Sequence, residues 1–107
     1  MALIALDFDG VLHDKAHPKP GRVMGAPIEL AKESLEALRR SGHTFFLHTA
    51  FGKTPREKDV IRNWMLYYGF PMMDIEYKPP AAAYVDDKGV GFTDWRTAYE
   101  ELRKRGL

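Results

Sequence analysis

The chain has 107 residues, of which 45% are hydrophobic and 29% charged, with a formal net charge of +1 and no cysteine. This length allows one domain with one core, and the lack of cysteine excludes disulfides, thiolate nucleophiles and zinc–thiolate sites. The near-neutral charge argues against a domain that wraps nucleic acid, since such domains are strongly basic. No apolar run approaches the roughly 18 residues of a membrane-spanning helix, and no signal-like segment precedes the first predicted strand. We therefore expect a single domain in a reducing cytoplasm, with no membrane partner.

The first predicted element is a strand over residues 2–8, because a short apolar run that begins at Leu3 ends abruptly in Asp7 and Asp9. In a parallel sheet this strand delivers both aspartates to the carboxyl edge, where open α/β folds bind ligands. Two carboxylates separated by one residue are costly unless a positive charge lies between them. A divalent cation bound by oxygen ligands is the usual remedy. The start of the chain therefore predicts a metal site.

A loop or small flap is predicted over residues 13–25, which are rich in proline, glycine and basic side chains. Its basic side chains include Lys15, Lys19 and Arg22. They either recruit anionic substrates or belong to an ordinary solvated loop, and the sequence favours neither interpretation. His13 and His17 are expected to be solvated, although both lie near the predicted pocket mouth.

A helix and a second strand are predicted next. Pro27 suits the first helical position, and Gly42 follows a basic last turn as a stop signal. Between them an apolar face recurs at helical spacing, formed by Ile28, Ala31, Leu35 and Leu38. A bulky strand over residues 44–48 follows and ends at Thr49. A hydroxyl is therefore expected at the same sheet edge as the two aspartates.

A second helix is predicted from a capping box at Thr54, with Pro55 at the first helical position and Gly69 as the stop. A third strand is predicted around residues 73–77. Lys78 lies directly after it, which adds an ammonium group to the predicted edge.

The last third of the chain predicts two further strands and a helix. A fourth strand over residues 82–85 would run straight into Asp86 and Asp87, and a very short fifth strand is predicted over 90–92. A last helix follows from residue 95 and ends in a basic turn. The acidic pair is therefore expected at the edge that also carries the first two aspartates.

Strands that alternate with helices predict an α/β fold. We expect a single Rossmann-like, three-layer sandwich over residues 1–107, with a short, mostly parallel sheet and helices on both faces. The strand ends would then gather one set of polar side chains at a single edge: Asp7, Asp9, Thr49, Lys78, Asp86 and Asp87. This set suits phosphoryl transfer, because a cation such as Mg²⁺ would neutralise the acids while the hydroxyl and the ammonium hold phosphate oxygens. One carboxylate could attack phosphorus.

These motifs resemble those of the haloacid dehalogenase-like (HAD) superfamily of aspartate-nucleophile phosphatases. Residues 3–12 match its apolar strand followed by D-x-D-G-[TV]-[LV], and residues 45–49 match its strand that ends in threonine or serine. The motif lysine matches Lys78, and the final acidic pair matches Asp86 and Asp87, in the family's order. The gaps between motifs are too short for the family's cap domain. The resemblance therefore implies a capless HAD-like member with an open site.

The resemblance also implies chemical roles for the first matched residues. Asp7 would be the nucleophile and a metal ligand. Asp9 would protonate the leaving group and then activate water, which points to phosphate-ester hydrolysis, and its backbone carbonyl would bind the metal. Thr49 would bind phosphate, and Lys78 would steady the charge of nucleophile and phosphate. Lys53 is an alternative to Lys78 as the phosphate-binding lysine.

The acidic pair has a metal-binding role in this resemblance. Asp86 would complete the Mg²⁺ shell, and Asp87 would contribute less directly, through a water. The expected function is thus that of a Mg²⁺-dependent HAD-like phosphatase that forms an aspartyl-phosphate. An open site admits a large phosphorylated substrate, including a macromolecule, and the oligomeric state is left open.

Three alternative functions remain. A non-catalytic phosphate-binding or regulatory protein would keep the fold without turnover. A nucleic-acid end phosphatase is compatible with an open site, although no interleaving of aromatic and basic residues argues for it. A response-regulator receiver is disfavoured, because receivers place the acidic pair first, the phosphorylated aspartate mid-chain and the lysine last.

Overall fold

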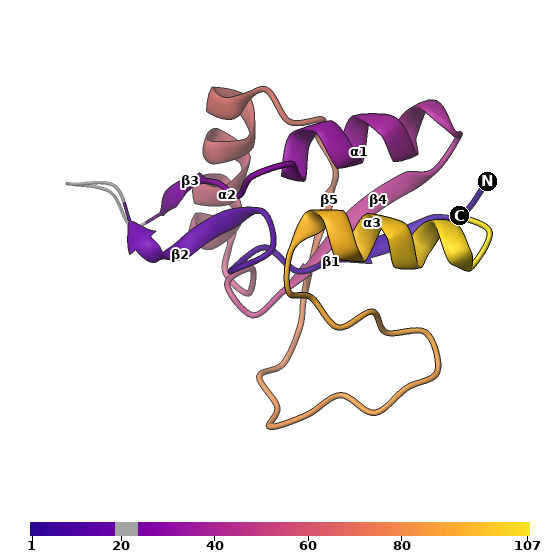
Figure 1. Ribbon diagram of the computed structural model, residues 1–107. Coiled ribbons are helices and arrows are strands. Elements are labelled where there is room, and N and C mark those ends of the chain that lie inside the picture. Colours follow the sequence, from indigo (N-terminus) through magenta and orange to yellow (C-terminus); the bar gives the residue numbers. More distant parts are fainter. Residues whose placement is uncertain (19–23) are drawn as a thin grey trace.

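Three parallel strands form the central sheet of the computed structural model, in which residues 1–18 and 24–107 are described (Figure 1). The strands are β1 (Leu3–Leu6), β4 (Thr44–Thr49) and β5 (Asp74–Tyr77), in the order β1-β4-β5. The register pairs Leu6 with Leu47 and Leu47 with Ile75. The expected α/β class with a parallel sheet is confirmed.

Helices and one hairpin complete the fold. The helices are α1 (Ala31–Arg40), α2 (Pro55–Tyr68) and α3 (Trp95–Lys104), and α1 contacts α3. The strands β2 (His13–Pro18) and β3 (Gly25–Pro27) form a separate antiparallel hairpin, which is the predicted flap. Lys19 and Arg22 lie outside the described residues, and so does the side chain of His17. None of the described helices has the length and apolar character needed to cross a membrane.

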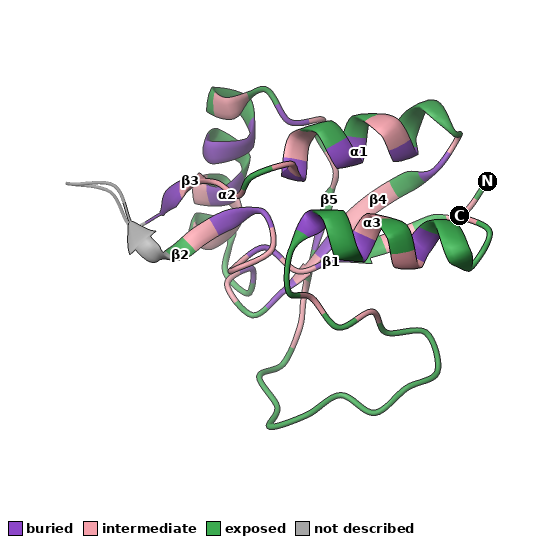
Figure 2. Cartoon of the chain, in the orientation of Figure 1, coloured by how far each residue is buried: buried purple, intermediate pink, exposed green. Residues whose placement is uncertain are grey.

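Burial alternates along the strands of the sheet (Figure 2). Leu6, Leu47 and Ile75 are buried in one core cluster together with side chains of all three helices. Ala5 and Glu76, which belong to the other face, are exposed. Because successive strand side chains point to opposite faces, the described helices pack against one face. The expected three-layer arrangement with helices on both faces is not confirmed, since the helix side chains of the core cluster pack with Leu6, Leu47 and Ile75.

The start of α1 differs from the prediction. The helix begins at Ala31 rather than at Pro27, because residues 25–27 pair with β2 instead. The N–H of Ile28 donates to the Leu12 carbonyl at 2.8 Å, which continues this attachment. Leu30 then turns the chain into the helix with a left-handed φ of 66°. Pairing with the hairpin therefore outweighs the helix-start signal of the proline.

The predicted cap of α2 is confirmed, and α3 also begins at a capping side chain. The Thr54 hydroxyl oxygen accepts the Glu57 N–H at 3.1 Å, and Gly69 ends α2 with a left-handed φ of 73°. Asp94 caps α3 by accepting the Thr97 N–H at 2.7 Å. These bonds satisfy N–H groups that have no partner inside a helix.

The two strands predicted after β5 are wrong. Residues 82–85 and 90–92 form no strand, and residues 81–89 are exposed throughout. They belong to a long connection from β5 to α3 that projects from the rest of the fold (Figure 1, orange). Val85, expected in the sheet, is 97% exposed.

Local hydrogen bonds explain the shape of this connection. The Tyr84 hydroxyl donates to the Pro79 carbonyl, and Asp86 accepts two backbone N–H groups. Such side-chain bonds compete with pairing in a sheet. Since three of the residues before Tyr84 are alanines, pairing with β1 would bury little apolar surface in return.

Candidate functional site

The turn after β1 presents the two aspartates. Phe8 between them is fully buried, and its carbonyl accepts the N–H groups of Leu12 at 3.0 Å and His13 at 3.3 Å. Gly10 bends the turn with a φ of 77°, a conformation that strains other residues. The half-buried Asp7 accepts the N–H of Phe8 at 2.7 Å. The anchored Phe8 thus fixes the backbone from which both carboxylates project.

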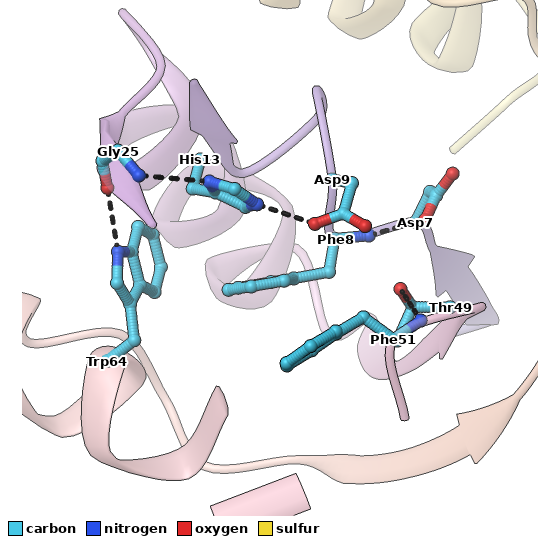
Figure 3. Close-up of polar contacts among 8 residues, drawn as sticks. All are labelled: Asp7, Phe8, Asp9, His13, Gly25, Thr49, Phe51 and Trp64. Carbon is cyan, nitrogen blue, oxygen red and sulfur yellow. Dashed lines mark hydrogen bonds and ion pairs between the residues drawn. The ribbon is translucent and has the colours of Figure 1, made fainter. Parts of the chain in front are cut away.

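Asp9 lies against a buried histidine (Figure 3). The His13 side chain is 3% exposed, and its Nε2 lies 2.6 Å from Asp9 Oδ1. The Nδ1 atom of the same ring accepts the N–H of Gly25 at 3.2 Å. Because an amide N–H can only donate, this arrangement assigns the ring proton to Nε2, which donates to the carboxylate. The expectation that His13 is solvated is wrong. Its neighbour Leu12 is fully buried, and its ring packs against the buried ring of Phe8.

Thr49 ends β4 as predicted, but its side chain is fully buried. Its hydroxyl oxygen accepts the N–H of Phe51 at 3.4 Å, so the hydroxyl shapes the loop after the strand. Gly52 packs tightly there, because a Cβ at this position would lie 2.9 Å from Cγ2 of Ile75. Because the Thr49 side chain is buried, its hydroxyl cannot make the predicted contact with phosphate in this conformation.

The two candidate lysines have different surroundings. The N–H of Lys78 donates to the Thr49 carbonyl at 3.0 Å, which holds the lysine at the sheet edge. Its ammonium lies 4.2 Å from the ring centroid of Tyr84. The ammonium of Lys53 lies 5.5 Å from the ring centroid of Tyr77 instead.

Asp86 organises a tight turn in the exposed connection. Its Oδ1 accepts the N–H groups of Lys88 at 2.8 Å and Gly89 at 2.5 Å. These two bonds, with a smaller contribution from nearby cations, hold the pKa of Asp86 below its ordinary value. Arg105, the residue that follows α3, donates to the carbonyls of Lys88 at 2.6 Å and Gly89 at 3.1 Å. The helix therefore holds this turn in place from the other side.

One cavity joins several of the predicted site residues. It has a volume of about 700 Å³ and lies between β1, the connection after β5 and α3. The predicted residues on its wall are Asp7, Lys78, Asp86 and Asp87. His48 adds an imidazole to this wall, and Trp95 adds an apolar surface. Asp9 and Thr49 do not line this cavity.

The aspartates have the chemistry of a magnesium site without its geometry. Their carboxylate oxygens are the hard ligands that Mg²⁺ prefers. Among the side chains that the structure describes, which leave out residues 16–23, no three His, Cys, Asp or Glu side chains are placed so that they could hold a metal ion. Asp86 and Asp87 would have to approach Asp7 to complete a coordination shell.

Sequence reasoning missed the roles of His13 and Arg105. The burial of His13 was indicated only by its place directly after the apolar Leu12, and its bond to Gly25 depends on the return of the hairpin. Arg105 belongs to a basic helix end, which by itself predicts an interaction with the helix dipole. Its contacts with residues 88 and 89 have no counterpart in the sequence pattern.

Comparison with known proteins finds two solved structures of similar fold. No protein-family model matches this chain, and no curated protein matches it. A conserved protein from Bacteroides thetaiotaomicron has a similar structure, with a TM-score of 0.67, 24% identity, and coverage of 98% of this chain and 91% of the other. A protein from Vibrio cholerae is similar with a TM-score of 0.70, 17% identity and 100% coverage of both chains. At these identities the likeness shows a shared fold alone.

Proposed function

We propose that this protein is a HAD-like hydrolase of phosphate monoesters, with Asp7 as the nucleophile and Asp9 as the acid and base. The position of Asp7 carries the proposal. It follows β1 at the carboxyl end of a parallel sheet, where open α/β folds bind ligands, and it shares a cavity wall with Lys78. A carboxylate and an ammonium that line one cavity suit attack on an anionic phosphoryl group, because the cation offsets the repulsion between the carboxylate and the phosphate.

The proposed reaction has two steps. An Asp7 carboxylate oxygen attacks phosphorus, the bond from phosphorus to the ester oxygen breaks, and Asp9 gives its proton to the departing alkoxide. A water then attacks the aspartyl-phosphate, Asp9 takes a proton from that water, and inorganic phosphate leaves. Both carboxylates return to their starting state. Lys78 would attract the phosphate charge in both steps.

Mg²⁺ is proposed as the cofactor on the chemistry of the donor set, and no step above is routed through it. The oxygen atoms of Asp7, Asp86 and Asp87 suit this ion. Because these residues stand apart in the present conformation, binding requires the connection after β5 to move toward β1. The cation, the cytoplasmic location and the single-domain organisation remain predictions.

Hydrolysis of p-nitrophenyl phosphate tests the proposal, measured with Mg²⁺ and with EDTA. The wild-type protein is expected to release p-nitrophenol only with the cation, and Asp7→Asn is expected to abolish release while the circular dichroism spectrum is retained. Asp74→Asn is the matched control, since this exposed aspartate begins β5 at the opposite end of the sheet. Equal activity of the Asp7→Asn and Asp74→Asn variants would contradict the role of Asp7.

A non-catalytic phosphate-binding protein is the second candidate function. The separation of the acidic residues favours it, because it leaves the catalytic set unassembled while Lys78 still lines the cavity. Calorimetric titration with inorganic phosphate distinguishes the candidates. Phosphate binding that is lost in Lys78→Met, without turnover of any ester, would support this second function and contradict the first.

A further inference from the structure

We infer that His13 is a positioning residue that fixes the orientation of the Asp9 carboxylate and couples it to the β2–β3 hairpin. This inference rests on the proposed function, in which Asp9 transfers protons. The contacts that carry it run from Asp9 through His13 and Gly25 to Trp64 (Figure 3).

Asp9 needs an external constraint. Its side chain is 37% exposed, and an exposed carboxylate can rotate about both side-chain torsions. The hydrogen bond of 2.6 Å from His13 holds Oδ1. Within the described part of the chain Oδ2 has no hydrogen-bond partner, and Figure 3 shows it pointing away from the imidazole. One oxygen is therefore held while the other is left for a substrate, as a general acid within reach of a leaving group requires.

The His13 ring is itself held from several sides. Its Nδ1 accepts the Gly25 N–H, and its centroid lies 4.7 Å from that of Phe8 and 6.1 Å from that of Trp64. Rotating the ring by half a turn would replace both nitrogens by carbon at their contacts and break both bonds. Because the ring is buried, the surrounding side chains prevent other orientations. The donor atom that faces Asp9 therefore has a fixed place.

The same contacts join Asp9 to the hairpin. Gly25 begins β3, and its carbonyl accepts the indole N–H of Trp64 in α2 at 2.9 Å. His13 begins β2. A displacement of the hairpin from α2 would remove the Gly25 contact that orients the imidazole, and Asp9 would lose its partner. The orientation of the acid thus depends on the hairpin that follows it.

Two substitutions separate the contacts of His13. His13→Gln keeps an amide nitrogen near the position of Nε2 and can still donate to Asp9. His13→Asn is shorter and reaches only the position of Nδ1, so it can accept the Gly25 N–H but cannot reach Asp9. His43→Gln is the matched control, because this buried histidine also accepts a backbone N–H, from Ala2 at 3.1 Å, and lies away from Asp9.

The activity test compares an alkyl phosphate with p-nitrophenyl phosphate at saturation. His13→Asn is expected to lower kcat for the alkyl ester by about 100-fold, which is the lower range of general acid catalysis, with KM unchanged. The p-nitrophenyl ester should lose much less, since its leaving group needs little protonation. His13→Gln and His43→Gln should retain the wild-type ratio between the two esters. In an Asp9→Asn background, His13→Asn should leave that ratio unchanged.

Equal losses for both esters in His13→Asn, or equal behaviour of the Asn and Gln variants, would overturn the inference. Nitrogen-15 spectra of the histidine rings test it without turnover, so failure of the proposed phosphatase activity can be told apart. The expected His13 spectrum has the proton on Nε2, and its signals shift in Asp9→Asn while those of His43 do not. A proton on Nδ1, or signals insensitive to Asp9→Asn, would contradict the inference even if the protein hydrolyses phosphate esters.

Discussion

Trp95, at the start of α3, donates its indole N–H to the Val11 carbonyl at 2.7 Å, across 84 positions of the chain. Trp64 makes the corresponding bond to Gly25 in the hairpin. The two tryptophans thus attach the Asp9 turn and the β2–β3 hairpin to different helices. Leaving a buried carbonyl without a hydrogen-bond partner destabilises the folded state. Each bond therefore stabilises the fold and also holds the backbone that it joins.

Trp95→Phe should lower the free energy of unfolding by more than the loss of buried ring surface alone would predict. The Val11 carbonyl would lose its partner, at a cost of about 1–3 kcal/mol. Urea titration followed by circular dichroism measures this change. Tyr99→Phe, on the half-buried side of the same helix, is the control. Equal stability of the Trp95→Phe and Tyr99→Phe variants would show that the indole bond contributes nothing.

Gly52→Ala should destabilise the fold through overpacking. The added Cβ would lie 2.9 Å from Cγ2 of Ile75 and 3.1 Å from Cγ2 of Thr49, both in the core. Overpacking of this kind costs about 1–3 kcal/mol. Gly91→Ala is the matched control, because a Cβ there meets nothing within 4 Å. Thermal unfolding of both variants checks the prediction, which fails if their midpoints agree.

Asp94 should make the stability of the protein depend on pH. Hydrogen bonds from Thr97 lower the pKa of this carboxyl in the folded state. A carboxylate with a lowered folded pKa stabilises the fold above its unfolded pKa, and that contribution is lost as pH falls through the folded value. The melting temperature of Asp94→Ala should therefore lie below that of the wild type at neutral pH.

The two melting temperatures should converge as the pH falls below the ordinary aspartate pKa of 3.8. Asp94→Asn keeps a capping oxygen without the charge, so its difference from Asp94→Ala should change little with pH. If the difference in melting temperature between wild type and Asp94→Ala stayed constant as the pH fell to the folded pKa of Asp94, the charge of this carboxylate would not contribute to the cap.

Arg105→Met should loosen the turn formed by Asp86. The guanidinium binds the carbonyls of Lys88 and Gly89, and the N–H groups of these residues bind Asp86. Without the guanidinium, backbone hydrogen exchange at residues 88 and 89 should become faster. Arg103→Met is the control, because Arg103 donates to the terminal Leu107 carbonyl instead. Unchanged exchange in Arg105→Met would show that the turn is stable by itself.

Local patterns in the sequence predicted the central sheet and all three helices, apart from the start of α1. The apolar run before Asp7 and the bulky run before Thr49 are long enough to identify buried strands. The caps at Thr54 and Asp94 involve residues only three positions apart, so the sequence contains both partners of each bond. The strand ends that carry Asp7, Thr49 and Lys78 follow from these elements, whereas the strand predicted before Asp86 does not form.

Long-range contacts decided the features that were not predicted. Pro27 pairs with His13 in the hairpin, which no helix signal near residue 27 could indicate. Which face of the sheet a helix covers is decided by contacts between distant residues. The local sequence pattern therefore could not test the expected second helix layer. Residues 82–85 have an apolar pattern, but local bonds of Tyr84 and Asp86 replace sheet pairing. His13 is buried because residues 13 and 25 meet across the hairpin.

The choice between Lys78 and Lys53 is the remaining question about the proposed site. Lys78 shares a cavity wall with Asp7, whereas Lys53 is exposed and lies near Tyr77. Lys78→Met should lower kcat/KM for p-nitrophenyl phosphate by about 100-fold or more, as the loss of a preorganised charge near a reacting group does. Lys53→Met should retain wild-type kinetics. The opposite ranking would assign phosphate binding to the loop after β4, since Lys53 belongs to that loop and Lys78 does not.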